Sequence, residues 1–523
     1  MAAPVGGLNT ISAAGGMPSS DCYVLYNMIA AEYGLRARLG YREWCTGLTG
    51  AADNQVRTIL PFSGSIAANN KLFAATSSGI WGVTTSSDAP SLLIAFGTTT
   101  GNAGYGECCT FVSQADGGHF LIYCDEVNGM YVYTQSTDTW AKVAAGAGAT
   151  EIAGTIDPAN AVFPLQFKNR LWLVERNTGY AHYLSTANAI YGTSVRFQFG
   201  SQFRNGGYLV GLWSWTQDGG AGIDDKLVAI SSGGDVVIYE LTDPSTPSGT
   251  ALKGVWDAGG MPAGRRVATR NGGDLLILSK LGLLPLSRLI VGSATQDGTQ
   301  YESRKISSLF NQLMISKSET IGWSMHLHPE DNALLVTVPT YTGTATEQLA
   351  MSVPMKSWCR YRDLPIYSAG SWAGKLYFGT TDGKVCINDG YVDAQSRDGA
   401  SFTDITWSLI TAYQNGGNGR QKQIQMIRPT FLGDSGQPTY AAEARYRYSF
   451  SEVGAINGAA VGGNTWDSGT WDSSSWGGDY GATSRVTGAA GMGPEFAVAL
   501  KGTSRSRTVL ANIDLLVTQG GFL

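Results

Sequence analysis

The amino-acid sequence predicts an all-β protein: a β-propeller of six or seven blades of antiparallel strands, with an additional C-terminal antiparallel β domain. Three observations predict this fold. A strand–turn–strand–turn–strand pattern recurs through residues 51–400 at a nearly constant step. Glycine accounts for 69 of the 523 residues, about twice its usual share of about 7%. Helical periodicity is confined to one short helix candidate, residues 308–323.

The repeat is clearest in residues 107–140, where short apolar strands are separated by turns at 115–118 and at Asn128-Gly129. Asn-Gly between apolar runs predicts a type I′ hairpin turn, because that turn needs positive φ at both central residues. Comparable units follow one another along the chain. They begin near residues 57, 108, 161, 208, 265, 321 and 365, a mean step of about 51 residues.

A step of about 40 to 50 residues carrying three or four antiparallel strands is typical of a propeller blade. One small meander cannot bury both of its faces, whereas blades stacked around an axis cover one another. A pair of β-sandwiches built from similar hairpins is the alternative. The constant step favours the propeller, since nothing in a sandwich requires one.

Three domains follow from this pattern. Residues 1–50 are predicted to be an N-terminal extended segment that contacts the propeller or neighbouring subunits, and residues 51–400 form the propeller. Residues 401–523 form a sandwich-like β domain for docking or for the tip of an assembly. In this last part, residues 440–450 alternate strictly, and residues 495–521 predict two strands across a polar turn.

Composition narrows the classes of protein. The 36 basic and 41 acidic residues give a net charge of −5, which provides no basic footprint for wrapping DNA. No apolar run is long enough for a transmembrane helix. The first residues lack the charged start and apolar core of a signal peptide. We therefore expect a protein that stays in the cytoplasm or is carried out within a larger assembly.

Seven irregularly spaced cysteines predict buried, reduced thiols, because no CxxC pair is present for zinc binding or redox exchange. They are Cys22, Cys45, Cys108, Cys109, Cys124, Cys359 and Cys386.

Sequence motifs for catalysis are missing: the chain has no GxSxG, HExxH or GxxxxGK[ST] pattern. His326 and His328 share one face of a predicted strand, but a metal site would need a third ligand, so we interpret both as ordinary strand residues. The expectation is a protein that is not an enzyme and takes no cofactor.

Acidic residues near the predicted turns leave one alternative open, a carbohydrate-binding or glycoside-cleaving propeller. Propeller glycosidases draw paired carboxylates from separate blade loops, although turn acids usually bind their own backbone. The acids are Asp116, Asp225, Asp274, Glu330, Asp382 and Asp389.

Three features are candidates for protein contacts. Trp466, Trp471 and Trp476 stand five residues apart in a Gly/Ser-rich loop, which is typical of a contact surface unless each ring folds back onto its own domain. Arg36 and Arg38 lie on one face of a predicted strand, suited to an acidic neighbouring subunit or simply to solvent. A third, basic set in the C-terminal domain is balanced by as many acids; it comprises Arg420, Lys422, Arg428, Arg445 and Arg447.

The N-terminal run from Ala3 to Leu48 resembles the opening of tail proteins from short-tailed bacteriophages, the podoviruses. The residues 71–84, "KLFAATSSGIWGVT", are similar to the first blade hairpin of that family, and the Trp/Asp-rich stretch and the ending "NIDLLVTQGG" are similar as well. The matching N-terminal positions are Pro4, Gly6, Gly7, Leu8, Asn9, Met17, Pro18, Asp21, Asn27, Arg38, Gly40 and Tyr41.

The family is that of the tail nozzle, the tail tubular protein B type. This resemblance implies a β-propeller protein of the virion that is assembled in the host cytoplasm. It forms a hexameric ring at the distal end of the tail, below an adaptor protein. The ring docks fibres or spikes, contacts the host envelope at its tip and passes genomic DNA without binding it sequence-specifically. From the net charge of −5 we further expect an acidic or neutral lumen, which would repel the phosphate backbone.

Overall fold

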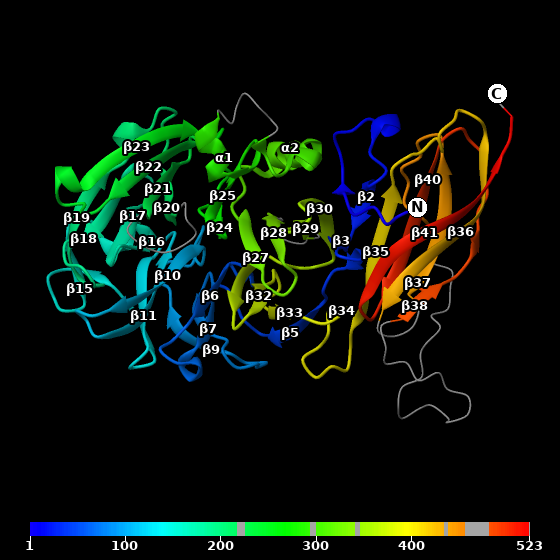
Figure 1. Ribbon diagram of the computed structural model, residues 1–523. Helices are drawn as coiled ribbons and strands as arrows, with labels where there is room; N and C mark the ends of the chain where they lie inside the picture. Colours follow the sequence, from blue (N-terminus) through cyan, green and yellow to red (C-terminus); the bar gives the residue numbers. More distant parts are fainter. Residues whose placement is uncertain (217–224, 293–299, 340–345, 434–437, 455–480, 522–523) are drawn as a thin grey trace.

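The computed structural model describes residues 1–523 apart from 217–224, 293–299, 340–345, 434–437, 455–480 and 522–523. The molecule is all-β and elongated, with a ring of small sheets at one end and a β-sandwich at the other (Figure 1). The predicted fold class is therefore confirmed, and the ring has seven blades.

Each blade contains an antiparallel meander of three or four consecutive strands. Blade one comprises β6 (Thr58–Phe62), β7 (Lys71–Thr76), β8 (Gly79–Gly82) and β9 (Ser91–Ala95). Blade two comprises β10 (Gly106–Ser113), β11 (Gly118–Asp125), β12 (Gly129–Thr134) and β13 (Thr139–Lys142). Blade three comprises β16 (Ala161–Phe167), β17 (Arg170–Glu175), β18 (Tyr180–Leu184) and β19 (Gly192–Gln198), extended by β15 (Glu151–Gly154) and β14 (Ala144–Ala145).

Blades four to seven continue the ring. Blade four comprises β20 (Leu209–Trp215), β21 (Lys226–Ser231), β22 (Asp235–Leu241) and β23 (Thr250–Asp257). Blade five has β24 (Ala268–Asn271), β25 (Asp274–Ser279) and β26 (Gly282–Pro285). Blade six has β27 (Ser324–His328), β28 (Ala333–Val338), β29 (Glu347–Ser352) and β30 (Ser357–Arg362). Blade seven has β31 (Ser368–Trp372), β32 (Lys375–Gly379), β33 (Val385–Asn388) and, as its outer strand, β5 (Tyr41–Cys45).

The unit starts expected from the sequence lie close to the first residues of the seven innermost strands, which are 58, 106, 161, 209, 268, 324 and 368. The turn at Asn128-Gly129 differs from the prediction. Only Gly129 has positive φ, because the Asp125 carboxylate accepts the backbone N–H groups of Val127 and Asn128 and fixes a longer loop. The type I′ prediction was therefore wrong at this hairpin.

Apolar side chains fill the spaces between blades, as the stacking argument requires. An aromatic cluster joins blades one and two, in which the Phe73 and Tyr133 ring centroids lie 4.8 Å apart. The same kind of cluster joins blade seven to blade one, where Cys45 and Val385 pack with Leu72. Because β5 supplies part of this last cluster, an N-terminal strand closes the ring.

In the described part of the chain, blade five has three strands and is followed by two α-helices. They are α1 (Leu286–Val291) and α2 (Ser307–Lys317). The predicted helix at 308–323 is confirmed in its first part. It ends at Lys317, whose carbonyl accepts the indole N–H of the buried Trp323 at 2.9 Å. Among the described residues, no helix has the length and apolar character needed to cross a bilayer.

The sandwich takes strands from both ends of the chain. One sheet contains β1 (Gly7–Leu8), β2 (Asp21–Tyr26), β34 (Val392–Asp393), β35 (Thr403–Thr411), β40 (Phe496–Ser504) and β37 (Thr439–Tyr446). The other contains β3 (Met28–Ala31), β4 (Gly34–Ala37), β41 (Thr508–Gln519), β36 (Lys422–Gly433), β38 (Gly481–Ser484) and β39 (Thr487–Gly488).

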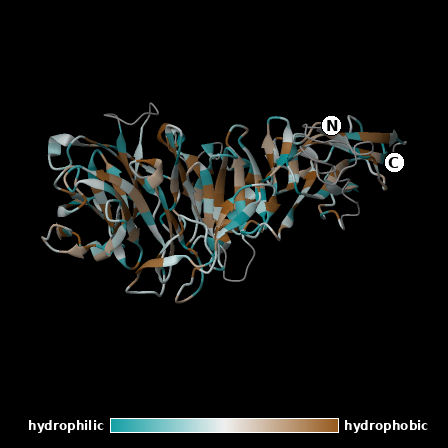
Figure 2. Ribbon diagram, turned by 90° about the horizontal axis from the view of Figure 1, so that it is seen from below, coloured by the Kyte–Doolittle hydropathy of each residue, from teal (hydrophilic) through white to brown (hydrophobic). Residues whose placement is uncertain are grey.

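The two parts of the molecule share a sheet. β2 pairs with β35 of the sandwich on one side and, in parallel, with β30 of blade six on the other. Residues 1–50 are thus built into both the propeller and the sandwich, and residues 401–523 do not complete the sandwich alone. Figure 2 shows hydrophobic residues along the strands of both parts.

Local patterns are confirmed with two adjustments. The two C-terminal strands lie where the sequence places them, as β40 and β41. The alternating strand at 440–450 ends early, at Tyr446, because Arg447 and Tyr448 turn away with positive φ. All seven cysteines are free thiols, as expected, although Cys108 and Cys109 are only half-buried.

Candidate functional site

The propeller encloses a cavity of about 250 Å³ on its axis. Every innermost strand contributes to its lining, from β6 through β31 in ring order. Phe163 and Trp213 give the wall an apolar part, with ring centroids 5.1 Å apart, and Glu107 and Arg266 are among its charged residues. This cavity is the channel of the propeller.

Arg266 crosses the channel from blade five to blades one and two, which lie opposite in a ring of seven. Its Nη2 donates to Thr58 Oγ1 at 2.6 Å and to the Gly106 carbonyl at 2.8 Å. Its Nη1 donates to the Arg57 carbonyl at 3.1 Å, and its Nε to Glu107 Oε1 at 2.8 Å. One side chain thus joins both sides of the ring and obstructs its axis.

Arg265 adds a second bridge in the same place. It forms an ion pair with Glu126 of blade two and donates to the Leu209 and Val210 carbonyls of blade four. Beside the two arginines the channel narrows to a hollow of about 20 Å³, room for about one water molecule. Arg265 and Arg266 therefore close the channel where its inner strands begin.

The Arg–Glu pairs also fix the charge state of the channel wall. Burial raises the pKa of Glu107, and the Arg266 guanidinium opposes that shift. Each of the two channel carboxylates, Glu107 and Glu126, has an arginine as its partner, so the pairs are neutral together. A glycosidase needs one carboxyl free to protonate the leaving group, and here both are bound to guanidinium groups.

His326 lines the channel, and its Nε2 atom has no hydrogen-bond partner among the residues that the structure describes. Burial, with a contribution from Arg266, lowers the pKa of His326 to about 3. An unfolded chain binds a proton there below about pH 6.5, so folding stability falls as the pH falls from that value to about 3. The loss from this one group reaches at most about 1.4 kcal/mol per pH unit.

We expect the His326→Gln variant to lose less stability than the natural chain between pH 6.5 and pH 4.5. The measurement is the free energy of unfolding from urea titrations at each pH. Glu107 titrates in both chains, so the difference isolates His326. Superimposable pH profiles would contradict the assigned burial of this imidazole.

Asp274 accepts the neighbouring Leu275 N–H, as expected for a turn acid, whereas Asp116 accepts the N–H of Ile190, 74 residues away. Asp116 accepts from Ser113 Oγ at 2.7 Å, and Asp274 accepts from Ser287 Oγ at 2.5 Å. Glu330 and Asp389 do come together, because both contact Lys375 Nζ, at 3.8 and 2.8 Å. The pKa of Asp389 is nevertheless lowered: partial burial would raise it, but the bond and charge of Lys375 and the charge of Arg42 outweigh burial. Asp389 is thus held ionised.

His328, which the sequence analysis interpreted as an ordinary strand residue, has hydrogen-bond partners for both of its ring nitrogens. His328 Nε2 is bonded to Asn388 Oδ1 at 2.7 Å, and its Nδ1 accepts the Asp331 N–H. Over the described ranges of the chain, no group of three His, Cys, Asp or Glu side chains is placed to hold a metal ion.

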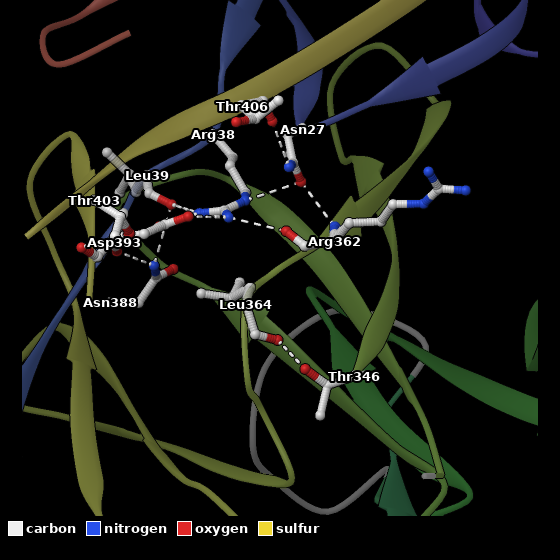
Figure 3. A network of polar contacts seen from close by, with 11 residues as sticks. Asn27, Arg38, Leu39, Thr346, Arg362, Leu364, Asn388, Asp393, Thr403 and Thr406 are labelled. Carbon is white, nitrogen blue, oxygen red and sulfur yellow. Dashed lines mark hydrogen bonds and ion pairs between the residues drawn. The ribbon is translucent and has the colours of Figure 1, made fainter. Parts of the chain in front are cut away.

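The joint between propeller and sandwich is centred on Arg38, which is fully buried between β4 and β5. Its guanidinium is bonded to both carboxylate oxygens of Asp393, Nη1 to Oδ1 at 2.7 Å and Nη2 to Oδ2 at 2.6 Å. Nε donates to Asn27 Oδ1, and the remaining donors reach the Leu39 and Arg362 carbonyls at 2.9 and 3.0 Å (Figure 3). All five N–H donors of Arg38 are satisfied.

Asn27 extends this network into both parts of the molecule. It adopts positive φ between β2 and β3, its Nδ2 donates to the Thr406 carbonyl, and its Oδ1 accepts the Arg362 N–H (Figure 3). Burial raises the pKa of Asp393, and Arg38 opposes the shift. Arg38, Asp393 and Asn27 therefore tie blade six, blade seven and the sandwich at one point. We call these three residues the joint cluster.

Arg36 and Asp21 reinforce the joint at its edges. Arg36 of β4 pairs with Asp331 in the β27–β28 turn of blade six. Asp21 of β2 is fully buried and accepts from Asn9 at 2.8 Å and from Lys305, which follows blade five, at 2.9 Å. Both ion pairs run between the N-terminal strands and the propeller.

The sequence-predicted contact residues have different outcomes. Arg36 and Arg38 do pair with acids, but the structure places those acids in the same chain and leaves Arg38 with no exposed surface. Trp466, Trp471 and Trp476 lie outside the described residues. The basic set in the C-terminal domain is dispersed: Lys422 is buried, while Arg428 and Arg445 pair with Asp514 and Glu443.

Sequence reasoning missed Arg265, Arg266, Glu107, Glu126 and Asp393. The adjacent arginines at the entry to an inner strand are the one local signal for the first two. The partners of all five lie more than 100 residues away, so no spacing rule could have joined them.

Fold and joint define the chain as a seven-bladed β-propeller protein with a sandwich built from both chain ends. No protein-family model and no curated protein sequence matches it. Among solved structures, it is similar to the computationally designed Ika8 protein at 8% identity and a TM-score of 0.34, covering 66% of this chain and 99% of that one. It is also similar to BBS1N, solved in complex with ARL6DN, at 11% identity and a TM-score of 0.38, covering 67% of this chain and 98% of that one.

A third similarity is to the extracellular domain of a one component system from B. thetaiotaomicron. The identity is 10% and the TM-score 0.40, with 82% of this chain and 56% of that chain covered. The chain thus spans about half the length of that bacterial protein.

Proposed function

We propose that this protein is a structural component of a short bacteriophage tail: the nozzle ring at its distal end, which forms the DNA exit channel and docks fibres or spikes. The observation that carries the proposal is where the residues of the phage resemblance lie. Asn27 and Arg38 form the joint cluster with Asp393. Asn9 and Asp21 bind one another at the start of β2, the strand whose other end leads to Asn27.

Gly40 and Tyr41 also belong to the residues that resemble the phage proteins, and they too lie where the propeller meets the sandwich. A side chain on Gly40 would collide with the Val392 carbonyl, so the close approach of β5 to the sandwich requires glycine there. The Tyr41 ring packs on Phe378 of blade seven, with centroids 5.6 Å apart. The resembling segment is thus the part that makes propeller and sandwich one stiff body, which is what a load-carrying ring needs.

In this proposal the DNA passes between copies of the chain, not through the propeller. The axial cavity of about 250 Å³ is smaller than the usual pocket for a small ligand, about 300–1,000 Å³. Duplex DNA does not fit through this space, because its major groove alone is about 12 Å wide and Arg266 crosses the axis of the propeller. A lumen of acidic or neutral character would then be formed by several subunits around a symmetry axis.

The native mass of the purified chain tests the ring. We expect a closed assembly of six chains of 55.4 kDa, seen by native mass spectrometry or sedimentation velocity. A ring of this kind repeats each weak contact six times, so the change from single chains to closed rings should occur over a narrow range of protein concentration. A chain that stays monomeric at all concentrations and hydrolyses a sugar polymer would contradict the proposal and support the glycosidase alternative.

A further inference from the structure

Blade three connects a hydroxyl, an imidazole and a carboxylate through two hydrogen bonds. Thr155 Oγ1 lies 2.8 Å from His182 Nδ1, and His182 Nε2 lies 3.2 Å from Glu175 Oε2. A hydroxyl bonded to a base that a third group orients is the arrangement of hydrolases that act through a covalent intermediate. Such sites are recognised by geometry and not by sequence order, so the missing sequence motifs do not exclude one here.

The carboxylate sets the direction of both hydrogen bonds. An ionised carboxylate only accepts hydrogen bonds, so His182 Nε2 carries the proton that Glu175 binds. Burial lowers the pKa of His182, although Glu175 opposes the shift, so the imidazole is neutral and its Nδ1 is an acceptor. Nδ1 therefore accepts the Thr155 O–H. The Ser194 carbonyl, 3.3 Å from the same oxygen, is the more distant acceptor.

The local fold fixes Thr155 and leaves it accessible. Thr155 directly follows β15, and its N–H donates to Ser194 Oγ at 3.0 Å. A side chain on the preceding Gly154, which has positive φ, would collide with the Ser194 carbonyl, so this approach requires glycine. The His182 side chain is 0% exposed and that of Glu175 is 19% exposed, whereas Thr155 is an exposed residue. The base is thus shielded from water while the residue that carries the hydroxyl faces the solvent.

A cation stands beside the imidazole. Arg196 of β19 is paired with His182 of β18, which places their Cβ atoms about 4.5–5.5 Å apart on one face of the sheet. The guanidinium of Arg196 lies over the Tyr180 ring, 4.6 Å from its centroid, and has no ion pair or hydrogen bond among the described residues. An unpaired guanidinium in this position can stabilise the negative oxygen that forms when an ester carbonyl is attacked.

We propose that Thr155, His182 and Glu175 form a site that cleaves small carboxylic esters. Thr155 Oγ1 attacks the carbonyl carbon while its proton passes to His182 Nδ1, and Glu175 positions the imidazole. The bond between the carbonyl carbon and the leaving alcohol oxygen then breaks, and the alcohol takes the proton from His182. Water, deprotonated by the same imidazole, hydrolyses the acyl-threonine and restores the hydroxyl.

Short acyl groups such as acetyl suit this site best, because an exposed residue offers little surface to bury a long acyl chain. The activity is additional to the nozzle proposal and does not depend on it.

Two reagents test the site on the full chain: p-nitrophenyl acetate, a chromogenic ester, and a biotin-tagged fluorophosphonate, which phosphonylates activated hydroxyls with loss of fluoride. We expect mass spectrometry to find the phosphonyl group on the peptide that contains Thr155. Thr155→Val keeps the shape of the side chain without its hydroxyl, so this label should vanish. The kcat/KM for the ester should fall at least about a hundredfold, the lower end of what general acid–base catalysis contributes.

Two further variants separate chemistry from folding. Thr155→Ser restores a hydroxyl and should recover both labelling and turnover, even if valine disturbs the blade. Glu175→Gln should lower kcat and leave KM unchanged. A glutamine amide can donate to His182 Nε2, which moves the imidazole proton to Nδ1, where it blocks proton transfer from Thr155.

Thr139→Val is the matched control, because Thr139 is an exposed threonine whose hydroxyl is bonded to the Thr137 hydroxyl and not to an imidazole. It should be labelled and turn over the ester as the natural chain does. The proposal is overturned if the fluorophosphonate does not label Thr155, or if Thr155→Val and Thr139→Val hydrolyse the ester equally fast. Neither result bears on the oligomeric ring, which the native mass reports separately.

Discussion

Replacing Arg38 with methionine is expected to lower the free energy of unfolding by about 3–5 kcal/mol, the usual cost of removing one partner from a buried ion pair. The substitution leaves the Asp393 carboxylate, 5% exposed as a side chain, without a counter-charge. It also removes the Arg38 donors from Asn27 Oδ1, which keeps the Arg362 N–H, and from the Leu39 and Arg362 carbonyls. Urea unfolding followed by circular dichroism measures the loss.

Two variants separate this effect from the general cost of losing an arginine. Arg428→Met removes an ion pair whose side chains are 53% and 40% exposed, so it should cost less than about 1 kcal/mol. The double variant Arg38→Met/Asp393→Leu removes both buried charges and should recover much of the lost stability. If Arg38→Met lowers the free energy of unfolding no more than Arg428→Met does, Arg38 does not hold the propeller and the sandwich together.

Closing the ring covalently is expected to stabilise the chain by up to about 5 kcal/mol, the chain-entropy value for a very long loop. Cys45 of β5 is paired with Val385 of β33. Paired antiparallel residues have Cα atoms about 4.5–5.5 Å apart, within the range that a disulfide spans. The Val385→Cys substitution should therefore allow Cys45 to form a disulfide with the introduced thiol, which would link the closing strand β5 to β33.

Thiol counting checks this closure before stability is measured. The variant has one thiol more than the seven native ones, and the bridge should remove two from titration under denaturing conditions. Cys386 packs in a different apolar cluster from Cys45 and Val385, so it does not compete. The control Cys45→Ser/Val385→Cys should keep all of its thiols. If the Val385→Cys variant also keeps all of its thiols under the same oxidising conditions, β5 is not the strand that closes the ring.

The propeller could be predicted because its blades are local structures. A meander is specified by neighbouring apolar strands and by the turns between them, so each unit can be recognised in about 50 residues of sequence. The same locality explains the wrong turn type at Asn128-Gly129. There the decisive group, the Asp125 carboxylate, binds the loop N–H groups in a way that the dipeptide rule does not include.

The joint could not be predicted, because its contacts join residues far apart in the chain. Arg38 and Asp393 are separated by 355 positions, and β2 lies between strands from blade six and the C-terminal part. From the sequence, Arg36 and Arg38 were expected to face an acidic neighbouring subunit or solvent. In the fold they pair instead with Asp331 and Asp393 of the same chain.

The channel was missed for the same reason. In the sequence, Arg266 lies before a predicted strand, with no sign of a special role. Its contacts exist only because the closed ring places blade five opposite blades one and two. Its bonds to Glu107 and Thr58 span 159 and 208 positions. A sequence repeat establishes that an axis exists, but side chains from distant blades decide whether that axis is open.

A cryo-electron microscopy reconstruction of the tailed particles that carry this chain tests the nozzle proposal most directly. We predict six copies around the tail axis at the distal end, with the DNA path between subunits and each propeller channel off the axis and closed by Arg265 and Arg266. A tail that lacks the chain, or one with a single propeller whose own channel coincides with the DNA path, would contradict it.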